Sequence, residues 1–293
     1  MAASQIGASE RLLNNGALTV RGGTFDVQNF TETVGTVVLA SGAINGSGAG
    51  TLIGSSYNVQ SGSASAILGG TAALTKSTDG TVTLTGANTY TGATTINDGT
   101  LVAAATSGGA LASTAAITVN ADGNLELGAN NQINNAAPIT LAGGTLSKGN
   151  FSEGSAGSAG LGALNLTAEG STIDFGIGTT GTLAFAIFNP GTNSLLIDNW
   201  TGTPGTVGDL STDRLIFQSD QSANLDQFLF TGFVGAMQFD LGGGFYEVTP
   251  GPLTPVPEIN PACIASSLCA GIAILVHRRA VRARRRREVS LAQ

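Results

Sequence analysis

Apolar and small polar residues alternate over most of the first 190 positions of the chain. Val82 and Leu84 are separated and flanked by threonines at 81, 83 and 85. The same alternation recurs in four other segments, at Ile117 with Val119, Leu125 with Leu127, Ile139 with Leu141, and Ile173 with Phe175 and Ile177. A period of two over four to six residues predicts short β-strands that bury one face.

A glycine followed by a small residue opens many of these segments. Gly-Thr-Leu or a close variant begins at Gly50, Gly80, Gly99, Gly123, Gly144 and Gly181. A β-sandwich and a β-solenoid both fit short strands at this spacing, but a recurring motif favours the solenoid, where like residues stack on like. We predict a right-handed solenoid over residues 1–189, with about eight coils and a length of about 40 Å. Almost no helix is expected before residue 258.

The residue pattern changes after Asn189-Pro190. Residues 190–250 lose the Thr-Gly repeat and become richer in Phe and Asp, and they contain the only Trp of the chain, Trp200. A solenoid needs an atypical terminal unit over its last apolar coil, so this region is predicted to be a β-rich cap, with a separate small binding domain as the alternative. The run 242–244 of three glycines is read as a hairpin turn, because it lacks the Lys and Ser/Thr of a phosphate loop.

The last forty residues have the composition of a membrane-delivery tail. A Pro-rich linker is expected at 251–261, a single short transmembrane helix at 262–277 and a basic cytoplasmic tail at 278–293. The basic stop-transfer residues are Arg278, Arg279, Arg282, Arg284, Arg285, Arg286 and Arg287. Cys263 and Cys269 are read as apolar fillers of the helix or as lipidation sites, and His277 as a residue of its flank.

Charge divides the chain in the same way. The tail carries seven basic residues and Glu288, near +6, whereas residues 1–277 hold five basic and eighteen acidic residues, near −13. An acidic body argues against nucleic-acid binding. The amino terminus lacks the basic start and apolar core of a signal peptide, which an exported protein should need. We therefore expect a truncated gene product or a misplaced start.

The body offers little for catalysis. His277 is the only histidine of the chain, so residues 1–276 contain none for a Ser-His-Asp or Cys-His site. Carboxylate chemistry on a β-helix remains the alternative, and its candidates are Asp174, Asp198, Asp209, Asp213 and Arg214. Calcium binding by Asp209, Asp213, Ser219 and Asp220 is a weaker alternative, because the known calcium-loop patterns are absent. We expect no enzyme activity, no cofactor and no metal.

Residues 80–102 resemble the autotransporter-associated β-strand repeat. The segment reads Gly-Thr-Val-Thr-Leu-Thr-Gly-Ala-Asn-Thr-Tyr-Thr-Gly-Ala-Thr-Thr-Ile-Asn-Asp-Gly-Thr-Leu-Val. The repeat recurs in secreted and surface proteins of bacteria, and the resemblance implies a right-handed β-helix stalk. It covers about one repeat closely, whereas residues 12–188 share only the general pattern of glycines, small polar residues and alternating apolar positions.

Residues 255–287 resemble the PEP-CTERM sorting tail. Val256, Pro257 and Glu258 match its motif, although Ile259 replaces the second proline, and the apolar run and arginines follow in order. The resemblance implies an exosortase-type membrane enzyme as processing partner, an inner-membrane anchor before processing, and release to the cell surface or extracellular matrix.

Together these features predict a non-enzymatic structural protein of the cell envelope or matrix. Its outward Thr and Asn rows are open to exopolysaccharide or to other surface proteins. Two alternatives remain. One is a polysaccharide-binding or polysaccharide-cleaving β-helix, which a groove containing Trp200, Asp198 and Asp213 would favour. The other is an adhesin that exposes the aromatic residues of 228–233.

Overall fold

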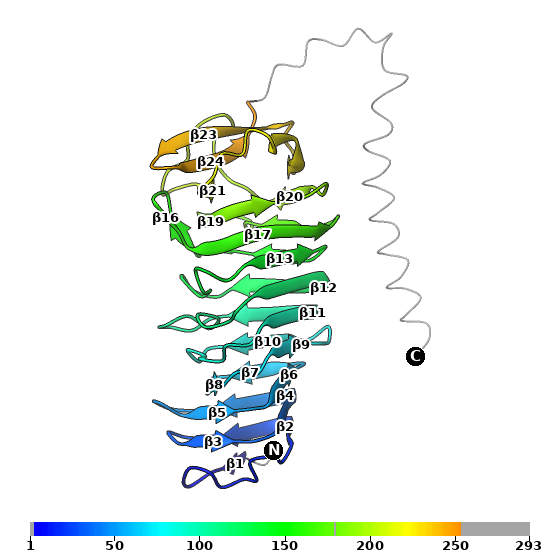
Figure 1. Cartoon of the computed structure of the whole chain (residues 1–293), viewed down its shortest axis with the longest axis vertical. Helices are drawn as coiled ribbons and strands as arrows, with labels where there is room; N and C mark the ends of the chain where they lie inside the picture. Colours follow the sequence, from blue (N-terminus) through cyan, green and yellow to red (C-terminus); the bar gives the residue numbers. More distant parts are fainter. Residues whose placement is uncertain (1–2, 179, 253–293) are drawn as a thin grey trace, which may run out of the picture. The chain divides into compact units, whose positions relative to one another are not determined.

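The computed structural model describes residues 3–178 and 180–252. They form a rod of stacked coils, in which each turn of the chain lies on the previous one (Figure 1). The strands of the first half are β1 (Ala3–Gln5), β2 (Leu18–Asp26), β3 (Thr31–Thr33), β4 (Thr36–Asn45), β5 (Thr51–Ile53), β6 (Ser56–Val59), β7 (Gly62–Ala64), β8 (Ile67–Gly69), β9 (Leu74–Lys76), β10 (Thr81–Leu84) and β11 (Thr94–Ala103). Those of the second half are β12 (Ile117–Leu127), β13 (Ile139–Ala142), β14 (Thr145–Ser147), β15 (Gly154–Ser155), β16 (Ser158–Ala159), β17 (Leu161–Ala168), β18 (Thr172–Asp174), β19 (Gly181–Asn189), β20 (Leu195–Asp198), β21 (Asp213–Phe217), β22 (Phe228–Phe230), β23 (Ala236–Gly242) and β24 (Phe245–Pro250).

Parallel pairing between successive coils runs almost the whole length of the rod. On one side the strands stack in the order β2, β4, β6, β9, β11, β12, β13, β17, β19. These nine levels give a solenoid of about nine coils. The all-β solenoid predicted from the alternation is therefore confirmed, and the sandwich alternative is wrong, because a sandwich would require antiparallel sheets.

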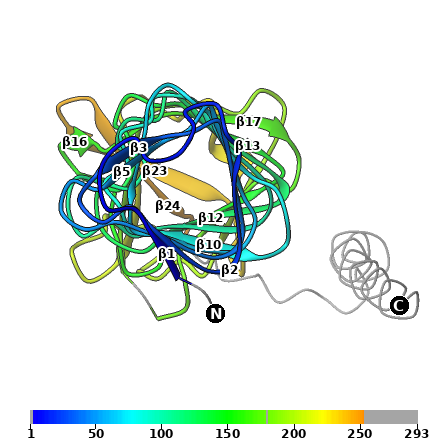
Figure 2. The same ribbon diagram turned by 90° about the horizontal axis from the view of Figure 1, so that it is seen from below.

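Stacking in register places like residues above one another. The inward column Ile96, Val119 and Leu141 is fully buried, and so is the neighbouring column that contains Leu125 and Leu146. One continuous apolar core follows from this, running from Ile6 to Val248. Viewed along the rod, the coils superimpose around it (Figure 2). The period-2 pattern was therefore a reliable guide to burial inside the strands.

Ile177 is the exception among the alternating residues. The alternation groups it with Ile173 and Phe175, which are fully buried, but Ile177 is 88% exposed. Strand β18 ends at Asp174, and Gly176 and Gly178 both have positive φ angles, so the chain turns away from the core before Ile177. Alternation inward and outward holds only while the backbone stays extended.

The repeated glycine lies at one corner of the coil, where successive backbones approach closely. Gly80, Gly99, Gly123 and Gly144 precede strand residues that pair with one another in successive coils. At Gly99, where φ is +67°, a Cβ would lie 2.4 Å from the carbonyl oxygen of Gly80. Backbones approach this closely only without a side chain. By contrast, Gly50 and Gly181 open strands on a different side of the coil, so the repeat intervals next to them depart from the length of one coil.

The carboxyl-terminal end of the rod closes with an antiparallel hairpin. Parallel pairing continues past Asn189, through β20 and β22 and from β19 to β21. Strand β24 then pairs antiparallel with β21, and β23 pairs antiparallel with β24. The three glycines of 242–244 form the turn between β23 and β24, each with a positive φ, as predicted. An antiparallel strand ends the parallel stack and covers the last coil.

Helices are almost absent from the part of the chain that the structure describes. A single 3-10 turn, η1 (Leu225–Gln227), is present there. Among residues 3–178 and 180–252, no helix is long and apolar enough to cross a bilayer. The transmembrane helix expected at 262–277, the basic tail at 278–293, and the motif Val256, Pro257 and Glu258 lie outside the described residues.

Candidate functional site

Buried polar side chains join the coils on the side of the solenoid where strands are short or missing. Gln132 accepts hydrogen bonds at Oε1 from the backbone N–H groups of Ala105 (2.7 Å) and Ala110 (3.1 Å), one coil earlier. Asn88 accepts from the N–H of Leu68 and donates to the carbonyl oxygen of Ala110. These amides satisfy buried backbone groups that no strand partner reaches.

Two glutamates act in the same way, at inward-facing positions. Glu32 accepts from the N–H groups of Arg11 and Leu12, at 2.8 and 2.6 Å. Glu153 is fully buried and accepts from the N–H of Gln132 at 2.5 Å. Burial raises the pKa of Glu153 to about 8, although the backbone N–H groups around it act in the opposite direction. Burial therefore favours the neutral acid form of Glu153.

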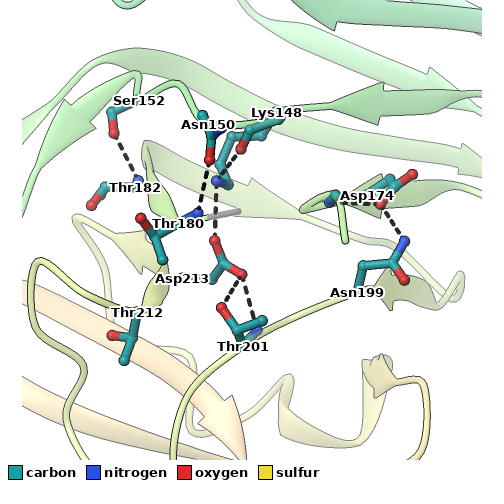
Figure 3. A network of polar contacts seen from close by, with 12 residues as sticks. Lys148, Asn150, Ser152, Asp174, Thr180, Thr182, Asn199, Thr201, Thr212 and Asp213 are labelled. Carbon is teal, nitrogen blue, oxygen red and sulfur yellow. Dashed lines mark hydrogen bonds and ion pairs between the residues drawn. The ribbon is translucent and has the colours of Figure 1, made fainter. Parts of the chain in front are cut away.

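A buried ion pair links the solenoid to its last coils (Figure 3). Lys148, directly after β14, reaches Asp213, the first residue of β21, with 3.0 Å between Nζ and Oδ1. Both side chains are fully buried. Oδ2 of Asp213 accepts hydrogen bonds from the backbone N–H (2.9 Å) and the hydroxyl (2.8 Å) of Thr201. Lys148 Nζ also donates to the carbonyl oxygen of Gly149 at 2.5 Å.

An aromatic ring and a glycine complete the surroundings of this pair. The ammonium lies 5.3 Å from the centroid of the Phe175 ring. A Cβ on Gly181 would lie 2.9 Å from Nζ, so the glycine leaves room for the lysine. Burial lowers the pKa of Lys148 and raises the pKa of Asp213, and each charge partly offsets the effect on the other. Both shifts favour the neutral forms of the two groups.

The carboxylates predicted for catalysis do not converge. Asp174 and Asp198 do stack in register, but on the outer face, and Asp174 accepts from Asn199 at 2.7 Å. Asp209 lies in an exposed loop, where its hydrogen bonds with Ser211 lower its pKa. Arg214 points away from Asp213 and pairs with the buried Glu247 at 2.7 Å. No site with two free carboxylates facing one substrate results from these positions.

Aromatic residues of the terminal coils pack in the core. Trp200 is buried and meets Phe230 and Phe233 edge to face, at centroid distances of 5.8 and 5.9 Å. Phe228 packs on Phe188 and is fully buried. The groove with Trp200, Asp198 and Asp213 that would favour a polysaccharide-binding or polysaccharide-cleaving β-helix is therefore not formed. The aromatic surface expected of an adhesin is not presented by Phe228 or Phe230.

Metal ligands do not gather in the described ranges. No group of three or more His, Cys, Asp or Glu side chains there could hold an ion. The side chains considered for calcium have other partners: Asp213 pairs with Lys148, and Asp220 accepts from Ser222 and Gln238. This part of the chain gives no support to the calcium alternative.

The outer faces carry ladders of small polar residues. Thr75, Thr95, Thr118 and Thr140 pair in successive coils and point outward, followed by Asn165 and Asn189. Asn189 donates to Asn165 at 2.9 Å, and a similar bond joins Asn120 to Asn97 at 2.7 Å. Short side chains allow coils to stack closely and leave hydroxyl and amide groups toward solvent.

The buried lysines were missed at the sequence level, although a signal was present. Lys148 follows Leu146 by two residues, and Lys76 follows Leu74 by two, so each occupies an inward position of an alternating strand. Lys76 stacks between Val59 and Ile96 in the core column and donates to the carbonyl oxygen of Asp98 at 2.9 Å. A lysine at an inward position predicts a buried partner.

This architecture defines a class: an elongated β-solenoid with a continuous apolar core, polar outer ladders and a terminal cap. Residues 74–103 match the family model described as passenger-associated-transport-repeat. The match supports the autotransporter-associated repeat recognised at 80–102, and it suggests a cell-surface or exported protein. Neither a curated protein nor a solved structure matches the chain. Fold and repeat together fit a surface structural or adhesin-like protein.

Proposed function

We propose that the protein is a non-enzymatic structural component of the bacterial cell envelope or extracellular matrix. The observation that carries the proposal is the parallel stack of about nine coils with the passenger-associated-transport-repeat in its middle. A rod of this kind acts passively, because each coil contacts only its neighbours and the outer faces stay open along its length. The Thr and Asn ladders offer hydroxyl and amide groups to exopolysaccharide or to other surface proteins.

Delivery through the tail is the second part of the proposal. Val256, Pro257 and Glu258, the apolar run 262–277 and the arginines between 278 and 287 would engage an exosortase-type membrane enzyme. In this scheme the chain is anchored in the inner membrane until the tail is cut, and the rod is then released or attached at the surface. The support for this part is the order and spacing of the three elements in the sequence.

The experiment is fractionation of the native cells, followed by intact-mass measurement of the protein from each fraction. Loss of the residues beyond about Pro257, with the rod recovered outside the inner membrane, is the expected result. A variant in which Glu258 is replaced by alanine should accumulate at full length in the inner membrane, whereas Glu126→Ala, on the outer face of β12, should be processed normally. A full-length wild-type chain that remains in the cytoplasm or inner membrane would refute the sorting scheme.

A binding test separates the structural role from the polysaccharide alternative. The purified rod is expected to associate with isolated matrix without shortening its polysaccharide. Release of reducing ends from that polysaccharide would contradict the non-enzymatic assignment. Substitution of Thr95 and Thr118 by lysine should weaken association with the matrix if the ladder forms the contact, while the same change at Ser158, on the β15–β16 hairpin, should not.

A further inference from the structure

The contact between Lys148 and Asp213 has the components of a covalent cross-link. A primary amine and a carboxyl group lie 3.0 Å apart, N to O, and both side chains are fully buried. They come from levels of the solenoid that are 65 positions apart in the chain. Fixing two reactive groups in contact removes most of the entropic barrier to a bond between them.

The polar contacts around the pair match those of an amide. Thr201 donates two hydrogen bonds to Oδ2 of Asp213, from its backbone N–H and its hydroxyl. The carbonyl oxygen of Gly149 accepts a hydrogen bond from Lys148 Nζ. Oδ1 has no hydrogen bond from any other group within the described ranges. Oδ2, which would become the amide oxygen, is thus held by two hydrogen bonds. Oδ1, which would leave as water, receives no hydrogen bond from another group.

We propose that Lys148 and Asp213 join in an intramolecular isopeptide bond between Nζ and Cγ. A buried ion pair is an expensive arrangement, because two charges have left water and few groups replace their hydration. Conversion to a neutral amide removes both charges. A dry site also favours condensation, because the water that is released leaves for bulk solvent.

The reaction balances without any further reactant. A proton first passes from the ammonium to Oδ1, giving a neutral amine and a neutral carboxylic acid, and burial favours both of these forms. The lone pair of Nζ then attacks Cγ, and the negative charge that develops on Oδ2 is stabilised by the two donors of Thr201. Nitrogen loses one proton to the departing Oδ1, the bond from Cγ to Oδ1 breaks, and one water molecule leaves. Oδ2 becomes the amide oxygen, and the amide N–H keeps its bond to Gly149.

The bond would close a covalent ring from 148 to 213 and fix the last coils to the coil that begins with β14. This inference is independent of the proposed function, because the bond depends only on the folded body. It can therefore fail while the envelope assignment stands, and the reverse is also true.

The test is a tryptic digest of the folded, full-length protein, performed after denaturation and analysed by mass spectrometry. The basic residues in this stretch are Lys76, Lys148 and Arg214. A cross-linked Lys148 is not a trypsin site, so the expected product is one fragment, 77–214, lighter by one water, about 18 Da. Fragmentation should place the branch between Lys148 and Asp213. Separate peptides 77–148 and 149–214 of unaltered mass, obtained from folded wild-type protein, would overturn the proposal.

A matched variant excludes other sources of the mass loss. Lys148→Arg keeps the positive charge but removes the amine, so cleavage after position 148 should return and the mass deficit should disappear. Succinimide formation at Asp79-Gly80, Asp98-Gly99 or Asp122-Gly123 would also remove one water, but it would persist in this variant. If the variant does not fold, the wild-type digest decides the question alone.

Discussion

The buried amide of Gln132 provides the sharpest test of how the coils hold together. Its Oε1 accepts from Ala105 and Ala110, and its Nε2 donates to the carbonyl oxygens of Ala105 (3.0 Å) and Asn130 (2.9 Å). Replacement by leucine keeps a side chain of similar size but removes all four bonds. Two buried backbone N–H groups then have no partner.

The expected loss follows from the number of orphaned groups. Each buried donor left without an acceptor costs about 1–3 kcal/mol, so Gln132→Leu should lower the free energy of unfolding by about 2–6 kcal/mol. The leucine regains part of this through apolar burial, which places the expected value in the lower half of the range. In a solenoid the effect should be concentrated at the interface between two neighbouring coils.

The assay is urea unfolding followed by circular dichroism, with hydrogen exchange to locate the weakened coils. Gln218→Leu is the control, because Gln218 is exposed and its side chain lies outside the core; its effect should stay within about 0.5 kcal/mol. Faster exchange is expected at Ala105 and Ala110 and not at Val20. Equal stability of the two variants would refute the view that inward polar side chains replace missing strand bonds.

Two further predictions concern the same framework. Gly92→Ala should destabilise the protein by about 1–3 kcal/mol, because the new Cβ would lie 2.2 Å from the carbonyl oxygen of Ala72. Gly7→Ala, where nothing lies within 4 Å of the new Cβ, should be neutral in the same urea assay. The pKa of Glu153 is raised from 4.5 to about 8 on folding, so its contribution to stability is complete below pH 4.5 and is lost as pH rises toward 8. Glu153→Gln should remove this decline in a comparison of unfolding at pH 5 and pH 8. A wild-type decline that survives in the variant would show that another group is responsible.

The residue pattern alone was enough to predict the strands and their buried faces. Alternation placed Val82, Leu84, Ile117 and Val119 in the core, where the structure has them, because the two-residue period of an extended chain fixes which side chains share a face. The recurring glycine predicted stacking, since only a coil that returns to the same place requires the same small residue again.

The partners of the polar residues depended on the fold. Lys148 and Asp213 are 65 positions apart, and nothing local in the sequence indicates which inward residue of a later coil a buried lysine meets. The candidate carboxylates likewise belonged to separate environments: Asp213 faces the core, Asp198 the outer surface, and Asp209 an exposed loop. Strand period sets the face that a residue occupies, but the path of the coil sets its neighbours. Pairings between distant positions therefore emerged only when the chain had been folded into three dimensions.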